Sequence, residues 1–129
     1  MPVKLDLNLP PRAEAAGYAR RSLEDLEPDL QPEVLESLRL LVSELVTNSV
    51  RHGDLTASDS IRLRLADRGD RIRVEVTDPG EGFDRRPPLS PDPERPSGWG
   101  LFLVSRIADR WGTSGEAPTT VWFELPRRS

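Results

Sequence analysis

The stretch ELVTNSVRHG, residues 44–53, closes the longest periodic segment of this sequence. The segment begins at about Pro32, which suits the first position of a helix, and Gly53 suits its C-terminal cap. Aliphatic residues recur every three or four positions between them, which predicts an amphipathic helix. A step of four residues places Glu44 and Asn48 one turn apart at the margin of its apolar face. The residues of the predicted buried stripe are Leu35, Leu38, Leu41, Val42, Leu45 and Val46.

Glu44 and Asn48 have the chemistry of a magnesium–nucleotide site. An amide oxygen is a hard ligand suited to Mg²⁺ that bridges phosphates, and a carboxylate can accept a proton from an attacking hydroxyl group. Taken alone, however, the same helix is more often an ordinary one with solvated polar residues along its rim. Both interpretations stay open until the other motifs are considered.

A second motif, DPGEGF, begins at Asp78 after two alternating segments, 61–65 and 71–76, which predict an antiparallel hairpin. Asp78 keeps the parity of the inward residues of the second segment, so its carboxylate points to the buried side if the strand persists. A buried carboxylate needs a specific partner, and the exocyclic amine of adenine can donate to it. Gly80 and Gly82 leave room for a sharp turn or a close ligand. An ordinary turn that ends a strand explains these residues equally well.

A third motif, SGWGL at residues 97–101, follows a segment that contains five prolines and only one large aliphatic residue. We expect that segment, about 84–97, to be a flexible loop or lid, because its prolines exclude regular structure. A helix is predicted from about 99 to 111. Glycines followed by exposed helical N–H groups can bind an anion, although a glycine pair before a helix is often only a tight entry.

The remaining periodic segments complete a fold of one domain, 1–129. Residues 3–9 and 119–125 alternate as strands, and residues 13–26 have a helical pattern. The predicted order is strand, helix, helix, two strands, lid, helix and strand. This order favours an α/β (α+β) two-layer sandwich in which helices cover one face of a mainly antiparallel sheet.

The composition excludes several classes of protein. The 129 residues include no cysteine and one histidine, so disulfides, zinc fingers and thiol nucleophiles are excluded. The net charge of −4 argues against direct binding of nucleic acid. The first residues, MPVKLDLNLPP, have neither the charged n-region nor the long apolar core that a signal peptide requires. No apolar run approaches the roughly 20 residues that span a membrane. We therefore expect a cytoplasmic protein.

The order of the three motifs is more specific than any one of them. E-x-x-x-N on a helix, D-x-G-x-G-F after a strand and G-x-G-L at a later helix resemble the N, G1 and G2 boxes of the Bergerat ATP-binding fold. That fold is shared by gyrase, mismatch-repair, heat-shock chaperone and histidine-kinase ATPase domains. Within this superfamily, LVSELVTNSVRHG and the final TTVWFELP look most like the anti-sigma regulatory factors, which are serine-protein kinases.

The resemblance implies a role for each motif. Asn48 would hold Mg²⁺ on ATP, Glu44 would be the general base, and Asp78 would bind adenine. The residues that it places around the base are Gly80, Gly82 and Thr119, and those that it places at the phosphates are Gly98, Gly100 and the N–H of Leu101.

The resemblance also implies a regulatory serine/threonine kinase that acts as an anti-sigma factor. Such a protein phosphorylates an anti-anti-sigma partner of the STAS type and sequesters a sigma factor, and it can form a homodimer. Trp99 departs from the pattern, because an arginine or a smaller residue is expected between the G2 glycines, and the lid has no lysine. These departures motivate an alternative, a non-catalytic module in which ATP orders the lid and changes a protein-binding surface.

Overall fold

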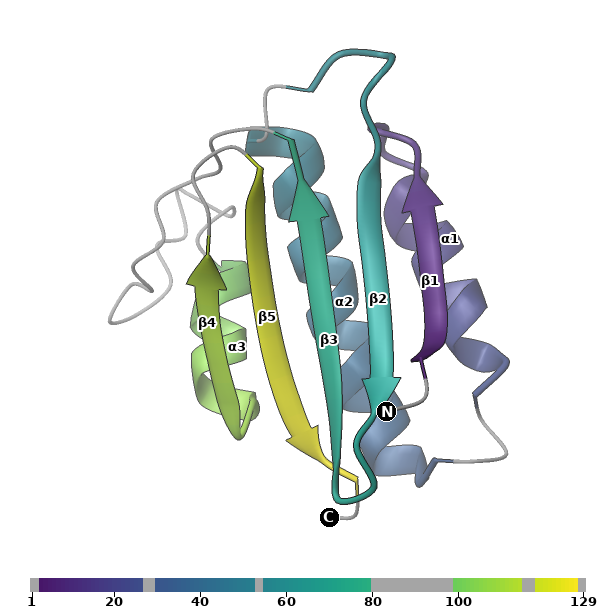
Figure 1. Cartoon of the computed structure of the whole chain (residues 1–129), viewed down its shortest axis with the longest axis vertical. Coiled ribbons are helices and arrows are strands. Elements are labelled where there is room, and N and C mark those ends of the chain that lie inside the picture. The colour runs from purple at the N-terminus through teal and green to yellow at the C-terminus, as the bar shows by residue number, and fades with distance from the viewer. Residues whose placement is uncertain (1–2, 27–29, 53–54, 80–98, 115–117, 128–129) are drawn as a thin grey trace.

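The computed structural model describes residues 3–26, 30–52, 55–79, 99–114 and 118–127. Within these ranges, five strands form one sheet and three helices pack against one of its faces, as Figure 1 shows. The predicted two-layer α+β architecture is therefore confirmed. In chain order the elements are β1 (Val3–Leu9), α1 (Ala15–Glu24), α2 (Pro32–His52), β2 (Ile61–Asp67), β3 (Arg71–Asp78), α3 (Trp99–Ile107), β4 (Arg110–Ser114) and β5 (Thr119–Pro126).

The sheet has the strand order β1-β2-β3-β5-β4, and every neighbouring pair is antiparallel. The predicted hairpin is formed by β2 and β3, with Leu63 opposite Val76. Its turn requires Gly69, whose φ of 91° is easily reached only without a Cβ atom. The backbone N–H of Gly69 donates to Oδ1 of Asp67 at 2.8 Å, which fixes the turn.

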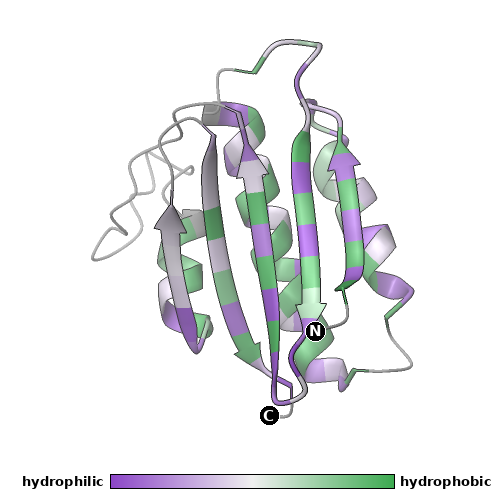
Figure 2. Ribbon diagram, in the orientation of Figure 1, coloured by the Kyte–Doolittle hydropathy of each residue, from purple (hydrophilic) through white to green (hydrophobic). Residues whose placement is uncertain are grey.

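The core lies between the helices and the inner face of the sheet. Hydrophobic and hydrophilic residues alternate along β2 and β3, as Figure 2 shows, because successive side chains of a strand point to opposite faces. Leu38, Leu41 and Val42 of α2 are fully buried against this face, as the helical period predicts. Within the described residues, no helix is both long and apolar enough to cross a membrane.

The prediction of a helix from 99 to 111 was wrong at its C-terminal end. α3 ends at Ile107, and Arg110–Ser114 forms β4 instead, an edge strand that the sequence analysis missed. Pairing with β5 explains the difference, because it places Trp111 opposite Phe123 on the inner face. The backbone N–H of Asp109 donates to the carbonyl oxygen of Glu124 at 2.9 Å and turns the chain into the strand.

Gly112 allows β4 to approach the large side chain that faces it. Gly112 is the register partner of Trp122, and a Cβ atom at position 112 would lie 2.9 Å from the indole ring. On the same outer face, the guanidinium of Arg73 stacks on this ring, 4.1 Å from the ring centroid. The indole is therefore held from two sides, with no space for a side chain at position 112.

We predict that Gly112→Ala lowers the free energy of unfolding by about 1–3 kcal/mol, because the new methyl group overpacks against Trp122. Urea unfolding of the two proteins measures this difference. Gly17→Ala is the matched control: Gly17 lies inside α1, and a Cβ atom there would meet only arginine tips at 3.8 and 3.9 Å. The control should instead stabilise the protein by about 0.5–1 kcal/mol. Equal effects of the two substitutions would contradict the prediction.

Candidate functional site

The last two turns of α2 carry the first pair of predicted site residues. Glu44 is half-buried, whereas Asn48 is 2% exposed. The amide nitrogen Nδ2 of Asn48 has no hydrogen-bond partner among the residues that the structure describes. An unpaired buried amide donor costs about 1–3 kcal/mol, and such groups are rare in native structures. Asn48 is therefore not a solvated residue on the rim of a helix, as the alternative interpretation of this motif had it.

The end of β3 carries the second predicted residue. β3 extends to Asp78, and the Asp78 side chain is 3% exposed on the inner face that Val74 and Val76 share. This confirms the orientation predicted from parity. Thr119, the first residue of β5, is the register partner of Asp78 and is also 3% exposed. The sequence had linked Thr119 to this region only through the family resemblance, and the strand pairing now places the two residues side by side.

A hydrogen bond on the other face of the sheet holds these strand ends together. Thr77 and Thr120 are register partners next to Asp78 and Thr119, and their hydroxyl oxygens lie 2.8 Å apart. Because both threonines face outward, they fix the spacing of the strands without occupying the inner face. The inner face at this end is left to Asp78 and Thr119.

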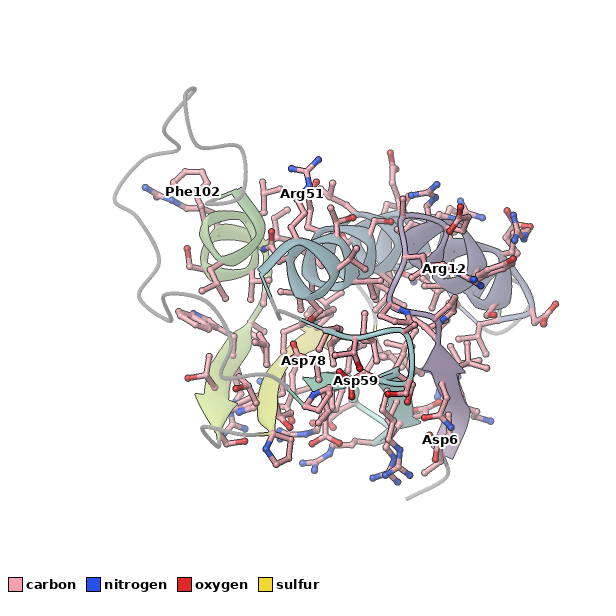
Figure 3. All side chains as sticks on the ribbon, turned by 90° about the horizontal axis from the view of Figure 1, so that it is seen from above. Asp6, Arg12, Arg51, Asp59, Asp78 and Phe102 are labelled. Carbon is pink, nitrogen blue, oxygen red and sulfur yellow. The ribbon has the colours of Figure 1, made fainter. Side chains whose placement is uncertain are left out.

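The C-terminal end of α2 lies at the same end of the molecule as the end of β3 and the start of β5 (Figure 1). α2 packs against both strands. In Figure 3, Asp78 lies on the side of the sheet that α2 covers, whereas Arg51 projects from α2 away from the sheet. The fold thus brings the Asn48 turn of α2 and the Asp78–Thr119 pair to one end of the interface between the two layers.

The third motif lies partly within the described residues. α3 begins at Trp99, packs beside α2, and buries Leu101 to 3% exposure. Gly100 is the second residue of this helix, so its backbone N–H is one of the first four, which have no acceptor within the helix. Its role in binding an anion stays a prediction. The other predicted residues of the second and third motifs, and the lid at about 84–97, lie outside the described residues; they are Gly80, Gly82 and Gly98.

An open depression of about 380 Å³ lies where the strands end, and Asp78 and Pro79 are among its lining residues. Its lining also includes the outward-facing Arg62 and Thr77 but neither Asn48 nor Thr119, so it is not the inner end of the layer interface. Ser58, Asp59 and Ser60 line it from the loop before β2, where no periodic pattern in the sequence pointed to them. No group of three or more histidine, cysteine or acidic side chains suited to a metal occurs in the described part of the chain.

Comparison with known proteins agrees with this geometry. The family model described as "Histidine kinase-like ATPase domain" matches residues 9–125. The serine-protein kinase RsbW of Listeria monocytogenes serotype 4a (strain HCC23) is 33% identical over 119 residues, which cover 82% of this chain and 76% of the relative. RsbW of Oceanobacillus iheyensis is 29% identical over 118 residues, which cover 81% and 75%.

Solved structures show the same fold. The histidine kinase domain from the Erythrobacter litoralis EL346 blue-light activated histidine kinase has a TM-score of 0.59 and 22% identity. The match covers 92% of this chain and 61% of that domain, so the likeness concerns the fold alone. Because the family model covers most of the sequence and a curated relative exceeds 30% identity, the chain belongs to the histidine kinase-like ATPase domain family, in the branch of the serine-protein kinases.

Proposed function

We propose that this protein binds ATP with Mg²⁺ and phosphorylates a serine or threonine of a protein partner, and that it acts as an anti-sigma factor. The observation that carries this proposal is the buried amide of Asn48, whose donor has no partner among the described residues and which lies on the helix beside the Asp78–Thr119 pair. The kinship with RsbW supports the kinase class.

The residues present fit a magnesium nucleotide. Mg²⁺ in nucleotide sites is held by one or two protein oxygens together with phosphates and water, so a site with few acidic side chains suits it. Oδ1 of Asn48 would be the protein ligand, and Nδ2 would donate to a phosphate oxygen. Asp78 would accept a hydrogen bond from the adenine amine, and the hydroxyl of Thr119 would lie beside the base. Bound ATP would supply the phosphoryl group that the partner accepts.

Glu44 would act as the general base. Its half-buried position, one turn before Asn48 on α2, would let its carboxylate take the proton of the attacking hydroxyl group while the other residues hold the nucleotide in place. For the remaining residues of the second and third motifs we propose the roles that the family resemblance suggests. The N–H of Leu101 and the backbone at Gly98 and Gly100 would face the phosphates, and Gly80 and Gly82 would shape the base pocket.

The partner in this proposal is an anti-anti-sigma protein of the STAS type. Phosphorylation would release that partner, and the kinase would then hold a sigma factor until unphosphorylated partner displaces it. In this proposal the protein acts in the cytoplasm as a single domain, 1–129, whose ATP lid is the segment at about 84–97. The alternative is a module that binds nucleotide and changes its surface without phosphoryl transfer, and the Glu44 experiment below separates the two.

We predict that Asp78→Ala weakens ATP binding by roughly 2–5 kcal/mol, because a buried acceptor for the adenine amine is removed. Isothermal titration calorimetry with and without Mg²⁺ measures this loss. Asp67→Ala is the matched control, since Asp67 is another buried carboxylate at a strand end, paired with Arg127 at 2.8 Å. Its loss should lower stability but leave ATP affinity unchanged. An equal loss of affinity in both variants would mean that Asp78 acts only through folding.

We predict that Asn48→Leu separates stability from binding. Leucine has nearly the shape of asparagine and no donor to satisfy, so the nucleotide-free protein should gain about 1 kcal/mol of unfolding free energy or stay unchanged. Binding of ATP should lose its dependence on Mg²⁺. Thermal unfolding with and without Mg·ATP measures both effects at once. A strongly destabilised variant would show that the Asn48 amide already has a structural partner.

We predict that Glu44→Gln keeps ATP affinity within about twofold and slows phosphoryl transfer by about 10²–10⁴-fold, as expected for loss of a general base. Transfer of labelled phosphate to a candidate STAS-type partner measures the rate. Glu36→Gln, two turns earlier on α2 and exposed, is the control and should change neither quantity. The non-catalytic module would be favoured by two results together: the wild-type protein binds ATP normally but phosphorylates no partner, and signalling stays intact in Glu44→Gln.

A further inference from the structure

The face of the sheet that the helices leave open is rich in arginine. Residues that point outward alternate with inward ones along the strands, and the inward residues of β2, β3 and β5 are buried. Arginines outnumber carboxylates by five to three among these outward strand positions, although the whole chain has a net charge of −4. The arginines are Arg62, Arg64, Arg71, Arg73 and Arg110, and the carboxylates are Asp6, Glu75 and Glu124.

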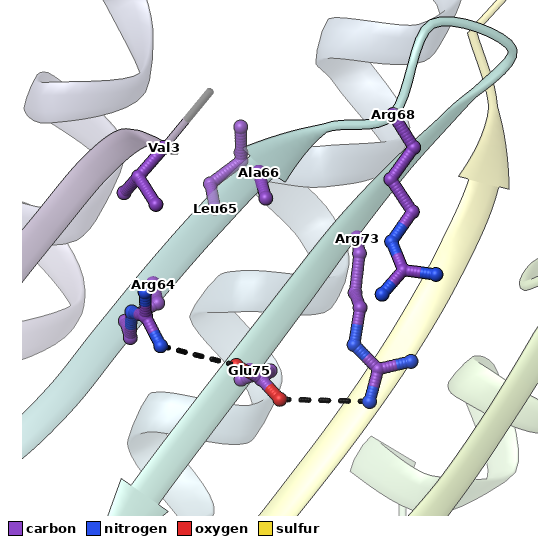
Figure 4. Close-up of a pocket in the computed structure, with 7 residues that line it drawn as sticks. All are labelled: Val3, Arg64, Leu65, Ala66, Arg68, Arg73 and Glu75. Atoms are coloured by element: carbon purple, nitrogen blue, oxygen red, sulfur yellow. Dashed lines mark hydrogen bonds and ion pairs between the residues drawn. The ribbon is translucent and has the colours of Figure 1, made fainter. Parts of the chain in front are cut away.

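A depression of about 290 Å³ lies on this face, shown in Figure 4. Its charged lining consists of Arg64, Arg68 and Arg73 with a single carboxylate, Glu75. Figure 4 shows the guanidinium groups of Arg68 and Arg73 side by side. The rim includes Val3, an apolar residue that is 46% exposed. The depression is therefore mainly cationic, with three arginines against one carboxylate.

The guanidinium of Arg64 makes no hydrogen bond to a carboxylate among the described residues, and its side chain is 40% exposed, so its outer nitrogens can meet a ligand. Its Nε is buried and has no acceptor among the described residues. Its nearest carboxylate oxygens belong to Asp6 at 3.6 Å and Glu75 at 3.9 Å, both too far for a hydrogen bond. Asp6 is already engaged by Arg62, which donates to it at 3.0 and 2.9 Å and holds its pKa below the ordinary value. Arg64 is therefore the surplus cation of this group.

Arg68 also shares its nearest carboxylate, that of Glu124, with other arginines. The Glu124 side chain is 3% exposed and lies within ion-pair distance of three arginines: Arg73 at 3.2 Å, Arg68 at 3.5 Å and Arg110 at 3.7 Å. Arg73 makes the hydrogen bond to Glu124, and its guanidinium is also fixed on Trp122. One carboxylate cannot satisfy three guanidinium forks, so Arg68 and Arg110 keep donors for an acceptor from outside.

The chemistry of the donors favours a carboxylate ligand. The backbone N–H groups of β2 and β3 are used in antiparallel ladders on both sides, so this part of the face offers side chains rather than the backbone nest that typically holds a phosphate. Guanidinium forks pair with carboxylates in a bidentate manner. The outward arginines extend over three strands, β2, β3 and β4, which suits an extended chain better than a single small ion.

We propose that this outer sheet face binds an acidic segment of a protein partner, whose aspartate or glutamate side chains pair with Arg64 and Arg68. The surface lies on the opposite side of the sheet from Asn48 and Asp78, so it is a second site, independent of the nucleotide site and of the function proposed above. An acidic partner would thus be held whether or not ATP is bound.

The test uses a fluorescein-labelled peptide of about ten glutamates as the probe, and fluorescence anisotropy as the readout. At low salt the wild-type protein should bind the peptide, and Arg64→Gln/Arg68→Gln should weaken binding about tenfold, as expected for two exposed pairs. About 0.3 M salt should weaken wild-type binding through screening. Adding Mg·ATP should leave it unchanged. Arg68→Gln alone should weaken peptide binding about threefold. Because Arg68 lies in an exposed turn, this single variant keeps the test valid if the double variant does not fold.

The control is Arg12→Gln/Arg21→Gln, which removes the same charge from exposed positions outside the sheet. It should change peptide affinity by less than about twofold. Equal losses in the two double variants would overturn the proposal, because binding would then follow net charge alone. Unchanged affinity in Arg64→Gln/Arg68→Gln would also overturn it. A third result would overturn the proposal: a thymidine oligonucleotide of equal charge binds more tightly than the peptide and depends on the same two arginines.

Discussion

The packing of α2 on β3 and β5 determines where the chemistry of this molecule can lie. Leu38, Leu41 and Val42 are fully buried in that contact, and the same helix continues for two more turns to Asn48 and beyond. Because a helix is rigid over this length, the packing of its first half fixes the position of its second half. Asn48 is therefore held at the layer interface by residues that take no part in any chemistry, which is the support that a precise binding site requires.

The sheet separates two surfaces with different chemistry. Because successive residues of a strand point to opposite faces, Asp78 reaches the inner face while Thr77 beside it reaches the outer one. β3 therefore contributes to the end of the layer interface where we propose that the nucleotide binds and to the arginine face, without sharing a side chain between them. A register shift of one residue would exchange the two sets, so the cross-strand pairs that fix the register also keep the surfaces distinct.

The sequence predicted what depends on local pattern and missed what depends on distant contacts. The α2 helix, the hairpin and the inward orientation of Asp78 follow from periods of 3.6 and 2, and all are confirmed. β4 was missed because its strand conformation comes from pairing with β5, which local pattern does not reveal. The sequence pattern also did not reveal that Arg64 lacks a hydrogen-bonded carboxylate. That lack arises because Asp6 pairs with Arg62, which lies 56 positions away in the chain. Glycines 80, 82 and 98 stay predictions.

The burial of Asn48 raises the question of why the chain retains it. Its Nδ2 donor has no partner among the described residues, and an aliphatic residue of similar size would fill the same space without such a donor. Selection for stability alone would therefore favour the aliphatic residue. A ligand that binds only the folded state and satisfies this donor offsets the cost, and it couples the stability of the domain to the ligand concentration. Unused hydrogen-bonding capacity inside a packed interface therefore indicates function more strongly than the same amide would on a solvated helix, where water satisfies it.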